Sequence, residues 1–89
     1  MSKLLHALGH AIRQVREDRN LSQERLAELA GLHRTYVSSV EQGRRNLSVE
    51  NIQKIANALG VSMTELVQLC EDRLDKSKDD KSKDNAGSR

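Results

Sequence analysis

The sequence contains no proline, tryptophan or phenylalanine, and only one tyrosine and one cysteine among its 89 residues. One cysteine cannot form an internal disulfide, which is typical of a protein of a reducing cytoplasm. No apolar run is long enough to cross a membrane, and the broken pattern after Met1 has no signal-peptide core. The length suits a single small domain. We therefore expect a cytoplasmic protein with no membrane contact, no separate sensing or catalytic domain and no small-molecule effector.

The net charge of +2 says little by itself, because many nucleic-acid-binding proteins are far more basic. The distribution of charge is more informative. The segment 34–46 carries three arginines and one glutamate, whereas the segment 65–72 carries three acids and no base. A small domain with a basic middle and an acidic end has one side that suits phosphate groups.

Apolar residues recur at the spacing of one helical face in five segments of the sequence. A first helix is expected over about 3–19, with one apolar stripe: Leu5, Leu8, Ile12 and Val15. Ser22 is suited to N-cap the second helix, and Ser62 with Glu65 forms a capping box for the fifth. Short connections between the helices predict a compact all-α domain of five helices.

The end of the sequence has a different composition. From residue 75 onward the chain is made of polar and charged residues and glycine, with Ala86 as its one apolar residue. We therefore expect a domain over residues 1–74 and a disordered charged tail over residues 75–89. The acids of the tail nearly balance its bases, so a solubilising role fits it better than non-specific binding to DNA.

The segment 23–42 has the pattern of two short helices that meet at a sharp turn. Ala27 lies one turn before the bend, where a crossing helix leaves room only for a small side chain. Gly31 stands at the bend, where a positive φ is tolerated without strain. Aliphatic residues supply the contacts between the two helices: Leu26, Val37 and Val40. This spacing predicts a helix-turn-helix whose second helix, about 33–42, enters the major groove of DNA.

The stretch from Leu8 to Leu69 resembles the Xre/Cro family of phage and bacterial repressors. Short motifs carry this resemblance: Arg16, Leu21-Ser22-Gln23, Leu26-Ala27, Ala30-Gly31, Val40-Glu41-Gln42-Gly43 and Leu59-Gly60-Val61-Ser62. Two further segments, Arg34-Thr35-Tyr36 and Arg45-Asn46-Leu47, are similar to the controller proteins of restriction–modification systems. The resemblance implies a lambda-repressor-like fold and a bacterial transcriptional regulator. Such a regulator would bind a pseudo-palindromic operator in double-stranded DNA as a homodimer.

With Val37 and Val40 pointing inward, four polar side chains share the outer face of the predicted recognition helix: Arg34, Thr35, Ser38 and Ser39. In the major groove, Arg34 can bind guanine through O6 and N7, and Thr35 can contact a thymine methyl group or a phosphate. The serines are short enough to let the helix approach the bases, but they also fit an ordinary exposed face. We expect these four residues to read the base sequence.

Seven other residues are candidates for contacts with the DNA backbone: Ser22, Gln23, His33, Tyr36, Arg44, Arg45 and Asn46. Ser22 and Gln23 stand at a helix N-terminus, which suits a phosphate, and the family uses the glutamine for that contact. His33 occupies the cap position of the recognition helix, where the family usually carries a better capping residue. Two of the seven have a simpler alternative, Tyr36 as a packing residue and Asn46 as a turn residue.

The resemblance also implies a structural pair, Arg16 with Glu41, which ties the first helix to the end of the recognition helix. The fifth helix supplies more apolar side chains than one buried face needs. We expect the surplus to form the dimer interface, drawn from one set of residues: Met63, Leu66, Val67, Leu69, Cys70 and Leu74.

Other function classes have less support in the sequence. His6 and His10 have the i, i+4 spacing of a metal-binding pair, but a zinc site needs more ligands and Cys70 is the one strong candidate left. No Ser–His–Asp arrangement or phosphate-binding glycine loop is present, so we expect no enzyme activity, no metal and no cofactor. The alternative is an antitoxin-type protein whose main partner is a toxin, although the predicted tail lacks apolar residues to hold one.

Overall fold

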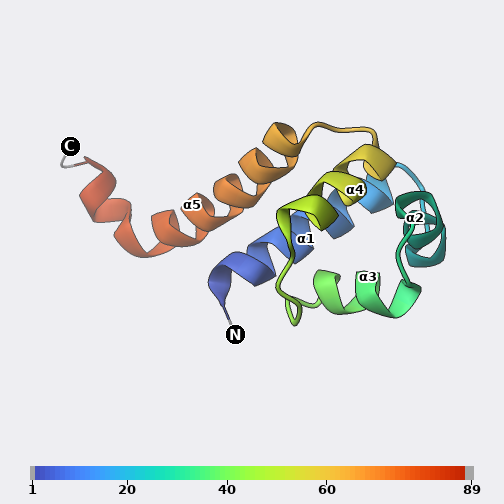
Figure 1. The fold of residues 1–89 in the computed structure, drawn as a ribbon. Helices are drawn as coiled ribbons and strands as arrows, with labels where there is room; N and C mark the ends of the chain where they lie inside the picture. Colours follow the sequence, from blue (N-terminus) through green and yellow to red (C-terminus); the bar gives the residue numbers. More distant parts are fainter. Residues whose placement is uncertain (1, 88–89) are drawn as a thin grey trace.

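The computed structural model describes the backbone of residues 2–87 and the side chains of residues 2–75. Its five helices follow one another in the chain as α1 (Lys3–Asp18), α2 (Gln23–Ala30), α3 (Arg34–Glu41), α4 (Val49–Leu59) and α5 (Met63–Gly87). Residues 2–87 contain no strand. The first four helices gather around one centre, and α5 leads away from them toward the C-terminus (Figure 1). This architecture confirms the prediction of an all-α, five-helix domain.

One aliphatic core joins all five helices. The largest fully buried side chains come from each helix in turn: Ile12, Leu26, Val37, Val40, Ile55, Leu59 and Leu66. Helix α5 packs mainly on α1, while α3 packs on both α2 and α1. The inner side of the recognition helix therefore packs against both α1 and α2.

The helix ends follow the local signals of the sequence. Ser22 accepts a hydrogen bond from the backbone N–H of Arg25 at 2.9 Å and caps α2. Ser62 and Glu65 exchange hydrogen bonds of 3.0 and 2.9 Å, which confirms the capping box of α5. Gly31 ends α2 with a left-handed φ of 71°. These short-range contacts fix both ends of α2 and the start of α5.

Two helix boundaries differ slightly from the sequence prediction. Helix α1 ends at Asp18 rather than Arg19, and α3 occupies only the inner part of the predicted range 33–42. His33 and Gln42 are the N-cap and C-cap of α3 rather than helical residues. Arg34 consequently lies at the first position of the recognition helix.

Helix α5 continues to Gly87, well beyond the last apolar residue of its predicted core-facing part, Leu74. The side chains of residues 76–89 lie outside the described part of the chain. The predicted division between a domain over 1–74 and a tail over 75–89 therefore stays a prediction. Over the residues that the structure describes, no helix has both the length and the apolar character that crossing a membrane requires.

Candidate nucleic-acid interface

The turn between α2 and α3 sets the angle of the recognition helix. The backbone N–H groups of Gly31 and Leu32 donate to the carbonyls of Glu28 and Ala27, at 3.3 and 2.9 Å. This pair of bonds is a Schellman motif, which stops α2 and redirects the chain within three residues. Ala27 is buried at the crossing, and Val37 is fully buried against the same core. The geometry confirms the predicted helix-turn-helix.

The four residues predicted to read bases lie together on the outer side of α3. Arg34 and Thr35 are exposed in its first turn, and Ser38 and Ser39 are half-buried one turn later. The Ser38 hydroxyl accepts a hydrogen bond of 3.4 Å from the side-chain amide of Gln42. Arg34 enters no ion pair among the described side chains. Its guanidinium is therefore available to a ligand.

Arg16 and Glu41 form a buried ion pair between α1 and the end of α3. The Nε and Nη2 atoms of Arg16 donate to the two carboxylate oxygens of Glu41 at 2.6 and 3.1 Å. The side chains are 10% and 2% exposed. A further bond of 2.7 Å joins Arg16 to the carbonyl of Leu21. The hydrogen bond with Glu41 raises the pKa of Arg16, although burial opposes this effect. The pair holds the recognition helix to α1.

Gln23 belongs to the same network. Its side-chain amide donates to Oε1 of Glu41 at 3.0 Å, the oxygen that also accepts from Nη2 of Arg16. An amide nitrogen carries two protons, and the second remains for a phosphate. The network therefore positions Gln23 at the start of α2 and leaves one proton of its amide free to donate to another acceptor.

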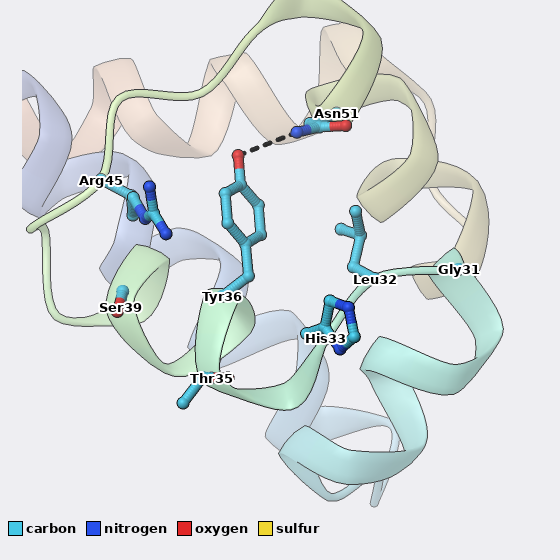
Figure 2. A pocket seen from close by; sticks show the side chains of 8 residues that line it. All are labelled: Gly31, Leu32, His33, Thr35, Tyr36, Ser39, Arg45 and Asn51. Carbon is cyan, nitrogen blue, oxygen red and sulfur yellow. Dashed lines mark hydrogen bonds between the residues drawn. The ribbon is translucent and has the colours of Figure 1, made fainter.

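Tyr36 stands between two elements that follow it in the chain. Its hydroxyl accepts a hydrogen bond of 2.9 Å from the side-chain amide of Asn51 on α4. The guanidinium of Arg45, from the loop after α3, lies 5.2 Å from the centre of the phenol ring. Figure 2 shows Asn51 and Arg45 on either side of the ring. Tyr36 is thus half-buried, with its ring and its hydroxyl both in defined contacts.

A hollow of about 500 Å³ lies between the α2–α3 turn, the outer side of α3 and the start of α4. Eight residues line it: Gly31, Leu32, His33, Thr35, Tyr36, Ser39, Arg45 and Asn51. The side chain of His33 makes no capping bond to the described part of α3, and it borders this hollow (Figure 2). Among the described residues no acidic side chain lines the hollow, so its surroundings suit an anion.

The loop after α3 brings the remaining candidates to the same side. Arg44, Arg45 and Asn46 are all exposed. Sequence reasoning missed Asn51, because a lone asparagine in the first turn of a helix carries no motif. Its contact is visible only in the folded chain, where the start of α4 comes beside Tyr36 of α3.

The set predicted for the dimer interface divides in two. Leu66 and Cys70 are 0% and 3% exposed because α5 packs both of them into the core of their own domain. Their assignment to the interface is therefore wrong. Burial also raises the pKa of the Cys70 thiol. Val67 and Leu69 are 42% and 40% exposed.

Met63 and Leu74 complete the predicted set, and both are half-buried. Both pack against the core, so Val67 and Leu69 are the two largely exposed members of the set.

The described residues contain no cluster of three metal-ligating side chains. His6 instead lies against Gly43, where an added Cβ would come within 2.6 Å of its Nδ1 atom. Nδ1 of His10 is buried with no hydrogen-bond partner in the described structure. Burial, together with Arg73 and Arg13, lowers the pKa of His10. The two histidines therefore lie in different environments, His6 against Gly43 and His10 with a buried ring nitrogen.

The chain is similar in sequence and in fold to known proteins. The family model HTH_3, helix-turn-helix, matches residues 12–66. The control protein C.BamHI of Bacillus amyloliquefaciens is 50% identical over 60 residues, which are 66% of this chain and 74% of that protein. The crystal structure of the restriction-modification controller protein C.AhdI from Aeromonas hydrophila superposes with a TM-score of 0.69 at 48% identity, covering 70% of this chain and 94% of that one.

A second solved controller protein, C.Esp1396I, was crystallised as a tetramer in complex with its natural 35 base-pair operator. It superposes with a TM-score of 0.76 at 30% identity, and the match covers 81% of this chain and 95% of that one. The family-model match over residues 12–66 includes the whole helix-turn-helix.

Proposed function

The chain belongs to the helix-turn-helix family, and from this membership we propose that it is a sequence-specific, homodimeric DNA-binding regulator of transcription that acts as a restriction–modification controller. Its similarity to several controller proteins over most of their length supports the finer assignment. The observation that carries the proposal is the outer side of α3, where Arg34 and Thr35 project from a helix held rigidly by the Arg16–Glu41 pair.

We assign two tasks to the residues of the interface. Residues on the outer side of α3 read base edges in the major groove: Arg34, Thr35, Ser38 and Ser39. Residues around them bind phosphates and fix the register of the helix: Ser22, Gln23, His33, Tyr36, Arg44, Arg45 and Asn46. The exposure of the three residues of the loop after α3 supports their share of the second task.

The regulator acts as a dimer on a two-fold operator. A single domain of this size contacts too few base pairs for useful specificity, and two copies double the number read. The exposed apolar side chains of α5, Val67 and Leu69, support an interface on that helix. Binding to an operator requires no cofactor and no catalytic residue, and a bacterial regulator of this kind acts in the cytoplasm. No observation on the described residues favours the antitoxin alternative.

The test is selection of the operator by the protein itself. Duplexes bound from a random-sequence library should share a pseudo-palindrome, with half-sites about 10–10.5 base pairs apart or a multiple of that spacing. Footprinting should then protect both half-sites together. Protection of one asymmetric half-site, or enrichment of no sequence at all, would contradict the proposal.

A further inference from the structure

We propose that Asn51, in the first turn of α4, is a positioning residue that directs the hydroxyl proton of Tyr36 toward a phosphate of the bound DNA. This inference rests on the proposed function, because it concerns a backbone contact of the same interface. Asn51 itself needs no contact with the DNA. It acts through the phenol, because its amide contacts the hydroxyl oxygen on the side that faces α4.

The direction of one hydrogen bond carries the argument. The Nδ2 atom of Asn51 donates to the hydroxyl oxygen of Tyr36 over 2.9 Å (Figure 2). A phenol has one proton to give and lone pairs to receive. Because the amide is the donor, the phenol proton takes no part in this bond. It remains available to an acceptor on the other side of the oxygen.

The surroundings of the phenol suit an acceptor that is an anion. The Arg45 guanidinium lies 5.2 Å from the centre of the ring, and the hollow beside it has no acidic side chain among the described residues that line it. A phosphate oxygen can only accept, and hydrogen bonds from a neutral donor to such a charged group are strong. The free proton of Tyr36 and the charge of Arg45 therefore serve the same ligand.

Asn51 is itself held in place. Its backbone N–H donates to the hydroxyl of Ser48, the N-cap of α4, at 3.1 Å. The side chain is half-buried, as is that of Tyr36. A helix start anchored in this way fixes the amide against the phenol before any DNA arrives, so little freedom of the Tyr36 side chain is lost on binding.

Exchanging the amide for a carboxylate tests the direction of the bond. In Asn51→Asp the side chain can only accept, so the phenol must give its proton to the carboxylate and none is left for a phosphate. An acidic residue suits the first turn of a helix, so α4 should still form. Gln53→Glu is the matched control, because it makes the same chemical change on an exposed residue of α4 that points about 200° away around the helix.

The measurement is a double-mutant cycle on a duplex that the wild-type protein selects from a random library. Tyr36→Phe should weaken binding about tenfold per half-site in the wild-type background. In the Asn51→Asp background the same change should alter affinity by less than about twofold, since the phenol proton is already given to the carboxylate and cannot reach the phosphate. In the Gln53→Glu background the tenfold penalty should remain.

Intrinsic fluorescence gives an independent readout in the free protein. Tyr36 is the one tyrosine and the chain has no tryptophan, so tyrosine emission reports on this phenol alone. A hydrogen bond donated by the phenol to a carboxylate should quench the tyrosine emission in Asn51→Asp. The emission of Gln53→Glu should stay unchanged. If Asn51→Asp fails to fold, Asn51→Ala replaces it, and there the Tyr36→Phe penalty should shrink because the hydroxyl has lost its support.

Three results would overturn the inference while leaving the proposed function intact. The first is a full Tyr36→Phe penalty in the Asn51→Asp background, and the second is no penalty in the wild type. The third is unquenched emission in a folded Asn51→Asp protein. If the wild-type protein selects no duplex, the proposed function fails and this inference fails with it.

Discussion

Arg34 and Arg44 carry the same charge but stand at different places on the interface. Arg34 opens the recognition helix, and Arg44 lies beyond the end of that helix in the following loop. A side chain in the groove contacts base edges, whereas a side chain beside the groove contacts phosphates. The two arginines should therefore differ in what their loss does to specificity.

Arg34→Ala should weaken binding to the selected operator by about 1–3 kcal/mol per half-site and binding to random DNA much less. Arg44→Ala should weaken both classes of DNA alike and lower the slope of the salt dependence by about one unit. Binding isotherms on operator and random duplexes at several salt concentrations measure both effects. An equal loss on both duplexes for Arg34→Ala would identify Arg34 as a phosphate contact.

The Arg16–Glu41 pair is a second residue-scale feature, because removal of one partner leaves a charge in the interior. Glu41→Gln should lower the free energy of unfolding by about 3 kcal/mol. Glu28→Gln is the control, since its ion pair with Arg25 is exposed, with side chains 68% and 54% accessible, and should cost less than about 1 kcal/mol. Urea unfolding followed by helical circular dichroism, at equal protein concentrations, measures both. Equal costs would mean that the buried pair contributes no more than a surface one.

At the scale of elements, the close approach of α1 to the end of α3 decides how the recognition helix is presented. A Cβ built on Gly9 would meet the carbonyl oxygen of Val40 and lie 2.8 Å from that of Glu41. Both are backbone atoms, which cannot rotate away as a flexible side chain can. The absence of a side chain at this position therefore sets the distance between the two helices.

Gly9→Ala should destabilise the domain by about 2 kcal/mol, because overpacking outweighs the gain of about 1 kcal/mol in helix propensity. Thermal unfolding measures the effect. Gln14→Ala, on an exposed position of the same helix, should change stability by a few tenths of a kcal/mol. A Gly9→Ala protein as stable as the wild type would show that α1 and α3 can separate at little cost.

The C-terminal part of the chain is a second question at this scale. Deletion of residues 75–89 should leave the melting temperature and the operator affinity nearly unchanged, because the sequence there has almost no apolar residue to bury. Melting curves and binding isotherms of the truncated protein test this. A marked drop in melting temperature would place the domain boundary later than residue 74.

At the scale of the whole molecule, the apolar residues of α5 that remain outside the core indicate an interface with a partner. Val67 is exposed, and a shallow groove lined by Met63 and Val67 runs along the same side of α5, whereas Leu69 lies about 200° away around the helix. A second copy of the chain would cover this groove and bring two recognition helices to one operator. An interface on α5 would therefore relate the two recognition helices by the same two-fold symmetry as the operator.

Val67→Glu should convert a dimer at micromolar concentration into a monomer, because dimerisation would bury an unpaired charge. The domain should stay folded, since Val67 contributes no fully buried side chain to the core. Sedimentation equilibrium measures the change, with Gln53→Glu as a control of the same charge on α4. A wild-type protein that stays monomeric to high micromolar concentration would rule out this role for α5, as would a dimer unchanged by Val67→Glu.

Local rules in the sequence determined the elements and the class of fold. Ser22 and Gly31 mark the two ends of α2, and Ser62 with Glu65 marks the start of α5. Both could be predicted because capping depends on hydrogen bonds over three or four residues. The inward position of Val37 and Val40 followed from the helical repeat alone. The outer face of α3 was predictable for the same reason.

Only the tertiary structure decided which equally apolar residues of α5 face inward. Leu66 and Cys70 are buried and Val67 and Leu69 exposed because α1 lies on one side of the helix, a fact that no residue of α5 encodes locally.

The link between Asn51 and Tyr36 is of the same kind, since it joins residues 15 apart on different helices. Short-range interactions can be read from neighbouring residues. Contacts between elements depend instead on how all the helices pack at once.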